Sequence, residues 1–277
     1  MPNTDTLDKI AASIMELNQQ LSKLSHQMFY QQQELKAYIK KELEKIQCQN
    51  HALHNLEVFF TQGTLPEIPL WKGGYPANPD FVWEQVQLIV QGNYDLILEF
   101  GSGYTTFFTA KTLQKLKNQG RTIPQAQTFE HLQVFFDKTK ADLNQAGLGD
   151  LIMLNHAPLR KYQDADGKTY PYYRCQERLA QLSQGSWRRI FVIVDGPPAS
   201  TGQDARYPAL PLVRQYFPQA DFDLILDDYG RNDEQNVAKR WIELCQAEQI
   251  PHSSQQLDLV RDALVLSVWP SRKANLT

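Results

Sequence analysis

Apolar residues follow two different spacings along this chain. Over the first 45 or so residues they recur three and four positions apart without a break, in a stretch that has no glycine, and no proline after Pro2. The members of this stripe are Leu7, Ile10, Ile14, Leu17, Leu21, Leu24, Met28, Gln31, Leu35 and Tyr38. A seam of this kind, sustained over several heptads, is typical of a coiled coil. The alternative is an amphipathic helix packed on its own domain.

The positions that flank this stripe are mostly polar and uncharged, for example Ser13, Asn18, Gln20 and Gln27. Interhelical ion pairs, which select the number and direction of the associating helices, are therefore few. We expect a homo-oligomer formed through this helix, and both dimer and trimer stay open.

From about residue 94 onward, short apolar runs alternate with segments of helical spacing. The runs that are typical of strands are 96–98, 126–131, 150–155, 189–195, 222–227, 256–260 and 263–269. Helical spacing covers 132–147 and 234–246, among others. This alternation predicts an α/β fold with a doubly wound, mostly parallel sheet of seven strands. The gap between the last two runs is too short for a crossover helix, so these strands should form a terminal antiparallel hairpin.

These patterns divide the chain into three parts. We predict a coiled-coil oligomerisation helix over 1–48, a linker that also covers the ligand cleft over 49–80, and the α/β domain over 81–277. Residues 65–80 contain four prolines and a Gly-Gly pair, which is typical of turns and ordered loops. Trp71 in this loop is a candidate to cover the cleft.

Composition narrows the classes of partner. With 28 basic against 31 acidic residues, the chain lacks the basic excess of nucleic-acid-binding proteins, so no nucleic-acid partner is expected. No apolar run reaches the roughly 18 residues of a membrane span, and the N-terminus lacks the pattern of a secretory signal. The three cysteines lie far apart, which disfavours a disulfide framework. We expect a cytoplasmic protein without a membrane span.

The most specific motif follows the first apolar run, where Glu99 precedes the turn Gly101-Ser102-Gly103. Glycine allows backbone angles and close approaches that a Cβ forbids. The helix that follows directs its positive N-terminal end at the turn. A dinucleotide-binding fold prefers a third glycine, but Thr106 stands at that position. An acid just before the turn suits a positively charged ligand instead.

The motif LEFGSG resembles the first motif of class I S-adenosylmethionine-dependent methyltransferases, and a parallel sheet with a terminal antiparallel strand resembles their fold. The resemblance implies that S-adenosylmethionine binds around this turn and at the neighbouring strand ends. The implied cofactor residues are Glu99, Gly101, Ser102, Gly103, Thr105, Glu130, His131, Asn155, His156 and Asp195. Glu130 ends the second predicted strand and matches the family's ribose-binding acid. Asn155 and His156 fall where the family usually contacts the adenine.

Three carboxylates end neighbouring predicted strands, Asp195 on one and Asp227 with Asp228 on the next. Like charges at short range raise one another's pKa, so these side chains are either splayed into water or hold something positive between them. Oxygen ligands suit a hard cation such as Mg²⁺. The pattern resembles metal-dependent O-methyltransferases, which implies Asp195, Asp227 and Asp228 as metal ligands. It also departs from them, because Pro-Pro-Ala at 197–199 replaces the usual nearby base. The base therefore stays open among Asp204, Asp228 and His156. We name Asp195 and Asp228 as the candidate catalytic residues.

Aromatic and arginine side chains in the predicted loops indicate where a methyl acceptor binds. Sugars stack on aromatic faces, and arginine forks bind phosphates or carboxylates. The candidates are Trp71, Tyr172, Arg206, Tyr207 and Arg231, together with Tyr170, Tyr173 and Arg174. The alternative for the segment YPYYR is a packed loop without a role in binding. Four segments taken together resemble a divergent bacterial group of class I methyltransferases that accompanies surface-polysaccharide genes. These segments are LEFGSGYTT, FEH, VDGPP with the following RYPAL, and LDDYGRNDE. The resemblance spans about residues 65–270 and implies O-methylation of a sugar, a glycan or a related small-molecule hydroxyl.

Two other functions stay open. One is a nicotinamide-dependent oxidoreductase, although the missing third glycine and the strand ends DGPP and LDDY count against it. The other is a non-catalytic coiled-coil scaffold with a methyltransferase-like domain. Titration with S-adenosylmethionine, its demethylated product and NAD distinguishes the three.

Overall fold

The computed structural model describes residues 4–60 and 77–273. The chain forms two compact units, Met1–Cys48 and Gln49–Thr277. Trp71 and most of the predicted proline-rich loop lie outside the described residues, so the role of Trp71 over the cleft stays a prediction.

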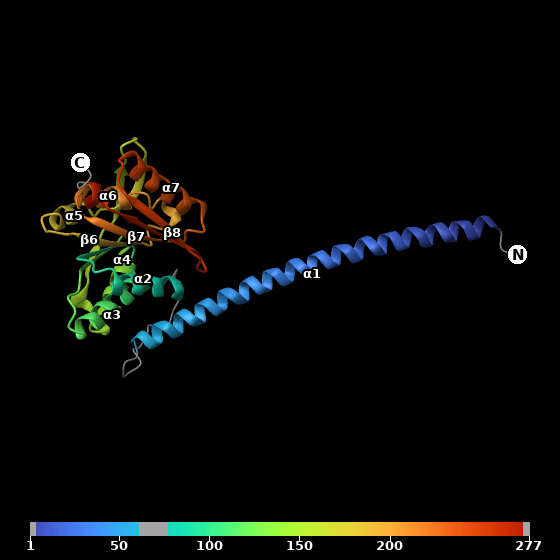
Figure 1. Cartoon of the computed structure of the whole chain (residues 1–277), viewed down its shortest axis with the longest axis horizontal. Helices are drawn as coiled ribbons and strands as arrows, with labels where there is room; N and C mark the ends of the chain where they lie inside the picture. Colours follow the sequence, from blue (N-terminus) through green and yellow to red (C-terminus); the bar gives the residue numbers. More distant parts are fainter. Residues whose placement is uncertain (1–3, 61–76, 274–277) are drawn as a thin grey trace. The chain divides into compact units, whose positions relative to one another are not determined.

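The helix α1 extends from Thr4 to Phe60 (Figure 1). In the first unit, the large apolar side chains of the predicted stripe, from Leu7 to Tyr38, are all exposed. In the second unit the same helix contributes Ala52 and Leu56, which are 4% and 1% exposed and therefore belong to a core. Residues 49–60, expected within the linker, thus form the last turns of α1.

The second unit is built on a sheet of seven strands in the order β3-β2-β1-β6-β7-β9-β8. These strands are β1 (Leu96–Phe100), β2 (Gln125–Glu130), β3 (Met153–His156), β6 (Arg189–Val194), β7 (Asp221–Asp227), β8 (His252–Leu257) and β9 (Ala263–Val268). Only β9 is antiparallel to its neighbours, β7 and β8, among the paired strands of this sheet. The predicted doubly wound sheet with a terminal antiparallel hairpin is confirmed.

Helices cover both faces of this sheet (Figure 1). One face packs on α2 (Pro79–Gln91), α3 (Tyr104–Asn118) and α4 (Gln133–Gln145), and the other on α5 (Gln176–Leu182), α6 (Ala209–Tyr216) and α7 (Asn232–Ala247). Alternate residues of β1 serve the two layers, because successive side chains of a strand point to opposite faces. Leu98 therefore lies in one core cluster with Trp241, and Ile97 in the other with Phe108.

Several elements differ from the expectation. Residues 159–163 and 169–173 form β4 and β5, a separate antiparallel hairpin that the sequence analysis did not predict. Strand β3 is shorter than predicted because Gly149–Leu151 forms a turn of 3₁₀ helix. Strand β8 lies about four residues earlier than predicted, because this edge strand, HSSQQL, is polar and largely exposed and so has no apolar run to mark it.

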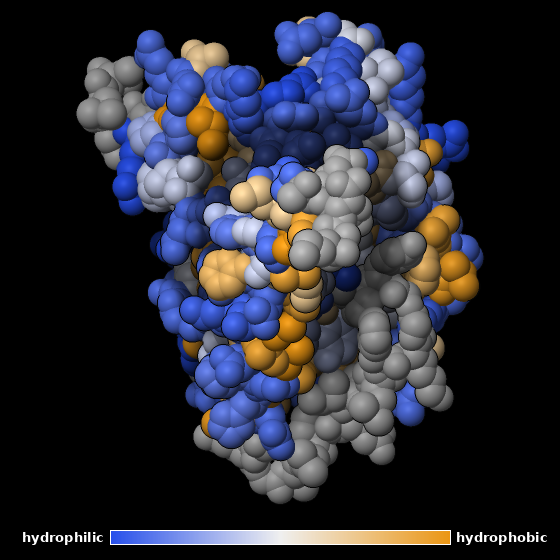
Figure 2. Space-filling view, turned by 90° about the vertical axis from the view of Figure 1, so that its right-hand side faces the viewer, coloured by the Kyte–Doolittle hydropathy of each residue, from blue (hydrophilic) through white to orange (hydrophobic). Residues whose placement is uncertain are grey.

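None of the helices in the described ranges is long and apolar enough to cross a membrane. The face of the molecule in Figure 2 is mostly hydrophilic, with hydrophobic side chains gathered in separate small patches. A short helix, α8 (Pro270–Lys273), ends the described chain.

Candidate active site

A pocket of about 470 Å³ lies at the carboxyl ends of β1, β2, β6 and β7. Open α/β sheets bind their ligands at this edge, and the volume lies within the range of small-molecule sites. Its wall includes Gly101, Glu130, His131, Asp195, Asp227 and Asp228. Residues of the predicted cofactor motif and of the predicted acidic group therefore share one cavity.

Gly101 brings the ends of β1 and β6 close together. Its φ is 106°, and a Cβ at this position would lie 3.2 Å from the carbonyl carbon of Asp195 and 3.3 Å from the backbone nitrogen of Gly196. Any side chain would therefore push the two strand ends apart. The neighbouring turn is closed by Thr106, whose hydroxyl accepts a hydrogen bond from the backbone N–H of Gly103 at 3.1 Å. The wall at this point is bare backbone.

Glu130 ends β2 and is held firmly at the pocket wall. Its Oε2 accepts hydrogen bonds from the backbone N–H and the hydroxyl of Ser102, at 3.1 and 2.8 Å. Its Oε1 accepts from the backbone N–H of Leu132 at 2.8 Å and lies 3.1 Å from Nδ1 of His131. Burial raises the pKa of Glu130, but the hydrogen bonds from His131, Leu132 and Ser102 outweigh burial and leave it below its ordinary value. The side chain is therefore a preorganised carboxylate.

Glu99 lies behind the turn rather than in the pocket wall formed by the described residues. Its side chain is 1% exposed, and its Oε2 accepts a hydrogen bond from the hydroxyl of Thr128 at 2.7 Å. Burial raises its pKa to about 7, although hydrogen bonds with Thr105, Thr128 and Thr106 act in the opposite direction. Thr105 and Thr106 lie in the first turn of α3. Through these hydrogen bonds, Glu99 on β1 connects the sheet to the start of that helix.

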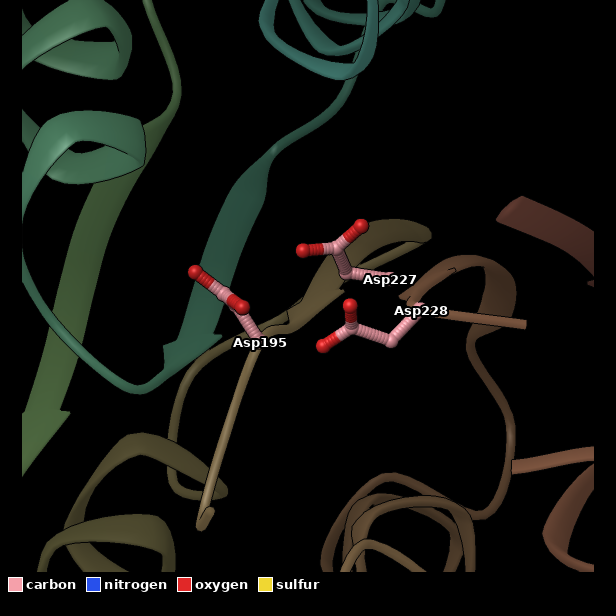
Figure 3. A group of neighbouring side chains, drawn as sticks. All are labelled: Asp195, Asp227 and Asp228. Atoms are coloured by element: carbon pink, nitrogen blue, oxygen red, sulfur yellow. The ribbon is translucent and has the colours of Figure 1, made fainter. Parts of the chain in front are cut away.

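The carboxylates of Asp195, Asp227 and Asp228 lie beside one another at the ends of β6 and β7 (Figure 3). One oxygen of each lies within 4.8 Å of the other two. Two consecutive side chains face the same group because Asp228 has a left-handed backbone, with φ 59°, whereas an extended strand would alternate them. Burial raises the pKa of Asp195 well above its ordinary value, and repulsion from Asp227 adds to this rise. Burial and the charge of Asp228 likewise raise the pKa of Asp227.

Arg206 is the cation next to this acidic group, and it is only 3% exposed. Its Nη2 lies 3.2 Å from Oδ2 of Asp228 and 3.8 Å from Oδ1 of Asp195, and its Nη1 donates to the carbonyl oxygen of Asp227 at 2.7 Å. Its Nε lies 3.7 Å from Oε1 of Glu234, a buried acid that the sequence analysis did not single out. The positive charge expected between the carboxylates is thus supplied in part by the chain.

Two of the predicted acceptor residues are core residues. Tyr172 is 1% exposed and packs against the ring of Phe100. Tyr207 is 7% exposed and lies under the guanidinium of Arg240, 3.6 Å from the ring centre. Neither belongs to the pocket wall that the described residues form. Tyr172 lies on β5 and packs inward, and Tyr207 is covered by Tyr170 of β5 and by Arg240 of α7. Arg231, by contrast, does line the pocket.

The residues predicted to contact adenine also lie away from this wall. The amide of Asn155 donates to the carbonyl oxygens of Met153 and Thr128, at 3.0 and 3.2 Å. His156 is exposed on β3 and packs near the ring of Phe136. Contacts of Asn155 and His156 with a cofactor stay predictions.

The pocket also contains residues that the sequence analysis missed. Leu132 and Phe135, 42% and 43% exposed, form an apolar part of the wall after β2. Tyr173, unlike these two, belongs to the predicted acceptor segment, and it lines the pocket with a buried hydroxyl that has no hydrogen-bond partner among the described residues. Arg261 reaches the pocket from the turn between β8 and β9. The short gap between the last two strands was the only signal that pointed to this turn.

Comparisons with known proteins give a likeness to solved structures. No family model matches the sequence, and no curated protein matches it. An O-methyltransferase from Bacillus cereus in complex with SAH has 15% identity over 80% of this chain and 90% of its own, with a TM-score of 0.45. The O-methyltransferase TomG from Streptomyces achromogenes, in complex with SAM, has 15% identity over 79% of this chain and 89% of its own, with a TM-score of 0.47. An SAH-bound methyltransferase from Podospora anserina has 14% identity over 69% and 79%, with a TM-score of 0.45.

The strand order and the single antiparallel strand of the main sheet are those of the class I methyltransferase fold. A function for this chain must rest on its own residues, and above all on what the pocket at the sheet edge brings together.

Proposed function

We propose that this protein is an S-adenosylmethionine-dependent O-methyltransferase that acts on a hydroxyl of a sugar, a glycan or a related small molecule. The observation that carries the proposal is the sharing of one pocket by two motifs of different chemistry. Gly101 and Glu130 form a bare-backbone turn with a fixed carboxylate, and Asp195, Asp227 and Asp228 face it from the next two strands. The first motif suits a nucleoside, and the second suits the activation of a hydroxyl.

The residues present fit S-adenosylmethionine. Glu130 offers carboxylate oxygens at the end of β2, where a ribose is bound in nucleotide-binding sheets, and its low pKa keeps it charged. Gly101 keeps this wall free of a side chain, because a Cβ there would lie only 3.2 Å from the carbonyl carbon of Asp195. The unpartnered hydroxyl of Tyr173 offers a further polar contact. When bound, the cofactor supplies an electrophilic methyl group on a sulfonium.

The chain's own contribution to such a reaction is positioning and proton transfer. Holding a nucleophile in line at near-attack distance supplies a large part of the rate in a displacement of this kind. In a mechanism without a metal, Asp195 is suited to accept the proton of the acceptor hydroxyl, because its raised pKa makes it a stronger base than an ordinary carboxylate. Asp228 lies on the acceptor side, next to Arg231. No covalent intermediate with the protein is required.

Isothermal titration of the full chain with S-adenosylmethionine, with its demethylated product S-adenosylhomocysteine (SAH) and with NAD tests the cofactor assignment. We expect the first two to bind. Glu130→Ala should weaken SAH binding by about 1–3 kcal/mol, since it removes charge-assisted hydrogen bonds. Glu177→Ala, which removes an exposed carboxylate on α5, is the matched control and should bind as the wild type does. Binding of NAD alone would replace the proposal with an oxidoreductase, and binding of neither would favour a scaffold.

We further propose that Asp195, Asp227 and Asp228 hold Mg²⁺. Three carboxylate oxygens within 4.8 Å of one another are a donor set that this hard cation prefers. Their mutual repulsion, seen in the raised pKa values of Asp195 and Asp227, is what a dication relieves. Bound there, the metal lowers the pKa of a coordinated hydroxyl. Asp228→Asn should then reduce methyl transfer much more than SAH affinity, and full activity in excess EDTA would exclude the metal.

We also propose that residues 1–48 associate the chain into a dimer or trimer. The support is the row of exposed apolar side chains at heptad spacing along α1, since an amphipathic helix is stabilised mainly by burying such a row. A truncation must keep residues 49–60, because Ala52 and Leu56 belong to the core of the second unit. Light scattering should give a multimer for the full chain and a monomer for residues 49–277. A monomeric full chain would contradict the proposal.

A further inference from the structure

Two arginines at the mouth of the pocket stand on loops that are joined to each other. Arg231 precedes α7, and Arg261 lies in the turn between β8 and β9. The backbone N–H of Tyr229 donates to the carbonyl oxygen of Asp262 at 3.1 Å, and that of Gly230 donates to the carbonyl oxygen of Arg261 at 3.2 Å. Because these two hydrogen bonds fix one loop against the other, the spacing of the two arginines is set before any ligand arrives.

The turn that carries Arg261 is fixed from a second side. The backbone N–H of Val260 donates to Oδ2 of Asp80 at 2.8 Å, and Asp80 is a buried residue at the start of α2. The turn is therefore held by α2 as well as by the loop before α7. A site assembled from rigid backbone loses little conformational freedom when a ligand binds.

The guanidinium groups of Arg231 and Arg261 keep most of their donors free. Their side chains are 47% and 41% exposed, whereas that of Arg206 is only 4% exposed. Nη1 of Arg231 lies 2.9 Å from Oδ2 of Asp228 and 3.9 Å from Oε1 of Glu234. Nη1 of Arg261 lies 3.8 Å from Oδ1 of Asp228, beyond hydrogen-bonding distance. Each guanidinium carries five N–H donors, so Asp228 engages a small part of the ten.

The charges at the mouth do not balance. Asp228 is the carboxylate nearest to both exposed arginines, and its Oδ2 is shared with the buried Arg206. Arg206 is compensated on the inside by Asp195, Asp227 and Glu234 as well. On the solvent side, the two exposed guanidinium groups of Arg231 and Arg261 share the one carboxylate of Asp228.

We propose, on the basis of the methyltransferase function proposed above, that Arg231 and Arg261 bind an anionic group of the methyl acceptor. Both residues line the pocket that contains Asp195, Asp227 and Asp228, so an acceptor held at its anion presents a neighbouring hydroxyl to those acids. Two guanidinium forks suit the planar or tetrahedral oxygens of a carboxylate or a phosphate. The acceptor is therefore an acidic sugar, a sugar phosphate or a similar anionic hydroxyl compound rather than a neutral one.

Ligand-observed NMR titration of the full chain, with and without SAH, tests this site. The probes are glucuronate for a carboxylate, glucose 6-phosphate for a phosphate and methyl glucoside as the neutral counterpart. We expect one or both anionic probes to bind at least about tenfold more tightly than methyl glucoside, the scale of one partly exposed charge-assisted contact. The preference should shrink when the salt concentration is raised, because these charges are open to solvent.

Arg261→Gln and Arg231→Gln should each weaken binding of the favoured anionic probe by about tenfold. Arg188→Gln is the matched control, since Arg188 is 92% exposed at the opposite end of β6, and it should change nothing. Arg261→Gln removes no side-chain hydrogen bond seen among residues 4–60 and 77–273, so it guards against misfolding of the Arg231 variant. Equal binding of charged and neutral probes, binding of none of them, or full binding by both variants would overturn the proposal. Loss of SAH binding by the wild type would instead overturn the methyltransferase assignment and leave the anion result readable.

Discussion

The pH dependence of folding should reveal the buried side chain of Glu99. Burial raises the pKa of this carboxyl from an ordinary 4.5 to about 7 in the folded state. The folded protein therefore holds this proton more tightly than the unfolded chain does. It follows that the stabilising contribution of neutral Glu99 is complete below about pH 4.5 and is lost as the pH rises through about 7.

The size of the effect follows from the two pKa values. A difference of roughly 2.5 units is worth about 3.5 kcal/mol, at about 1.4 kcal/mol for each unit. Between pH 5 and pH 8 the free energy of unfolding should lose about 2.5 kcal/mol of this, because roughly a quarter of the total is already lost at pH 5. Glu99→Gln keeps the shape of the side chain and cannot ionise, so the variant should lack this loss.

Urea unfolding of wild type and Glu99→Gln at pH 5, 6, 7 and 8 measures the difference. Other buried acids, among them Asp195 and Asp227, contribute to the pH dependence of both proteins and cancel in the comparison. Glu177→Gln, which removes an exposed carboxylate, should retain the wild-type dependence. If Glu99→Gln loses as much stability between pH 5 and pH 8 as the wild type, Glu99 is ionised throughout and the reasoning from burial is refuted.

Two further changes test the packing of the pocket. Arg206→Met should lower the free energy of unfolding by about 3–5 kcal/mol, because it leaves buried carboxylates without their cation. The control Arg188→Met should lower it by less than about 0.5 kcal/mol. Equal effects of the two substitutions in urea unfolding would show that the buried ion pairs contribute little to stability. Gly196→Ala places a Cβ 2.2 Å from the hydroxyl oxygen of Tyr173 and 3.3 Å from Cα of Gly101, so the wall must shift. SAH affinity measured by calorimetry should fall about tenfold in this variant, the scale of one displaced contact. An unchanged affinity would show that the side chain of Tyr173 moves aside without weakening SAH binding.

The central sheet could be predicted because its strands are buried on both faces. A strand such as LILEF, in which every residue is buried, is apolar at every position except Glu99, and such runs stand out from amphipathic helices. The hairpin of β4 and β5 could not be found in this way, because LRKYQ is polar and TYPYY contains a proline. Its position depends on Asp164, which accepts hydrogen bonds from the backbone of Lys168 and from Arg240 on α7. Such a contact spans 76 positions of the sequence and leaves no local pattern.

The candidate site could be predicted where it depends on strand ends. Glu130, Asp195 and Asp227 each follow an apolar run, and parallel strands bring their carboxyl ends to one edge, so their convergence followed from the topology. The burial of a loop residue, by contrast, does not follow from the topology of the sheet. Arg206 and Tyr207 stand in a loop that was expected over the cleft, yet both are buried, Arg206 among acids and Tyr207 under Arg240.

The burial of each arginine at this edge of the sheet decides whether it can bind a ligand. Arg206 is surrounded by Asp195, Asp227, Asp228 and Glu234, so any movement toward a ligand would leave several buried carboxylates uncompensated, at a cost of several kcal/mol. Arg231 and Arg261 share one of those acids from the solvent side and can turn toward a ligand while the inner pairs stay in place. The three residues have the same chemistry and lie around one carboxylate, but substitution of the inner one should lower the free energy of unfolding by about 3–5 kcal/mol, whereas substitution of either outer one should affect only what binds. Measuring the free energy of unfolding and anion binding on variants of all three arginines separates these roles. If burial did not divide the roles, each of the three variants would lose both stability and anion binding.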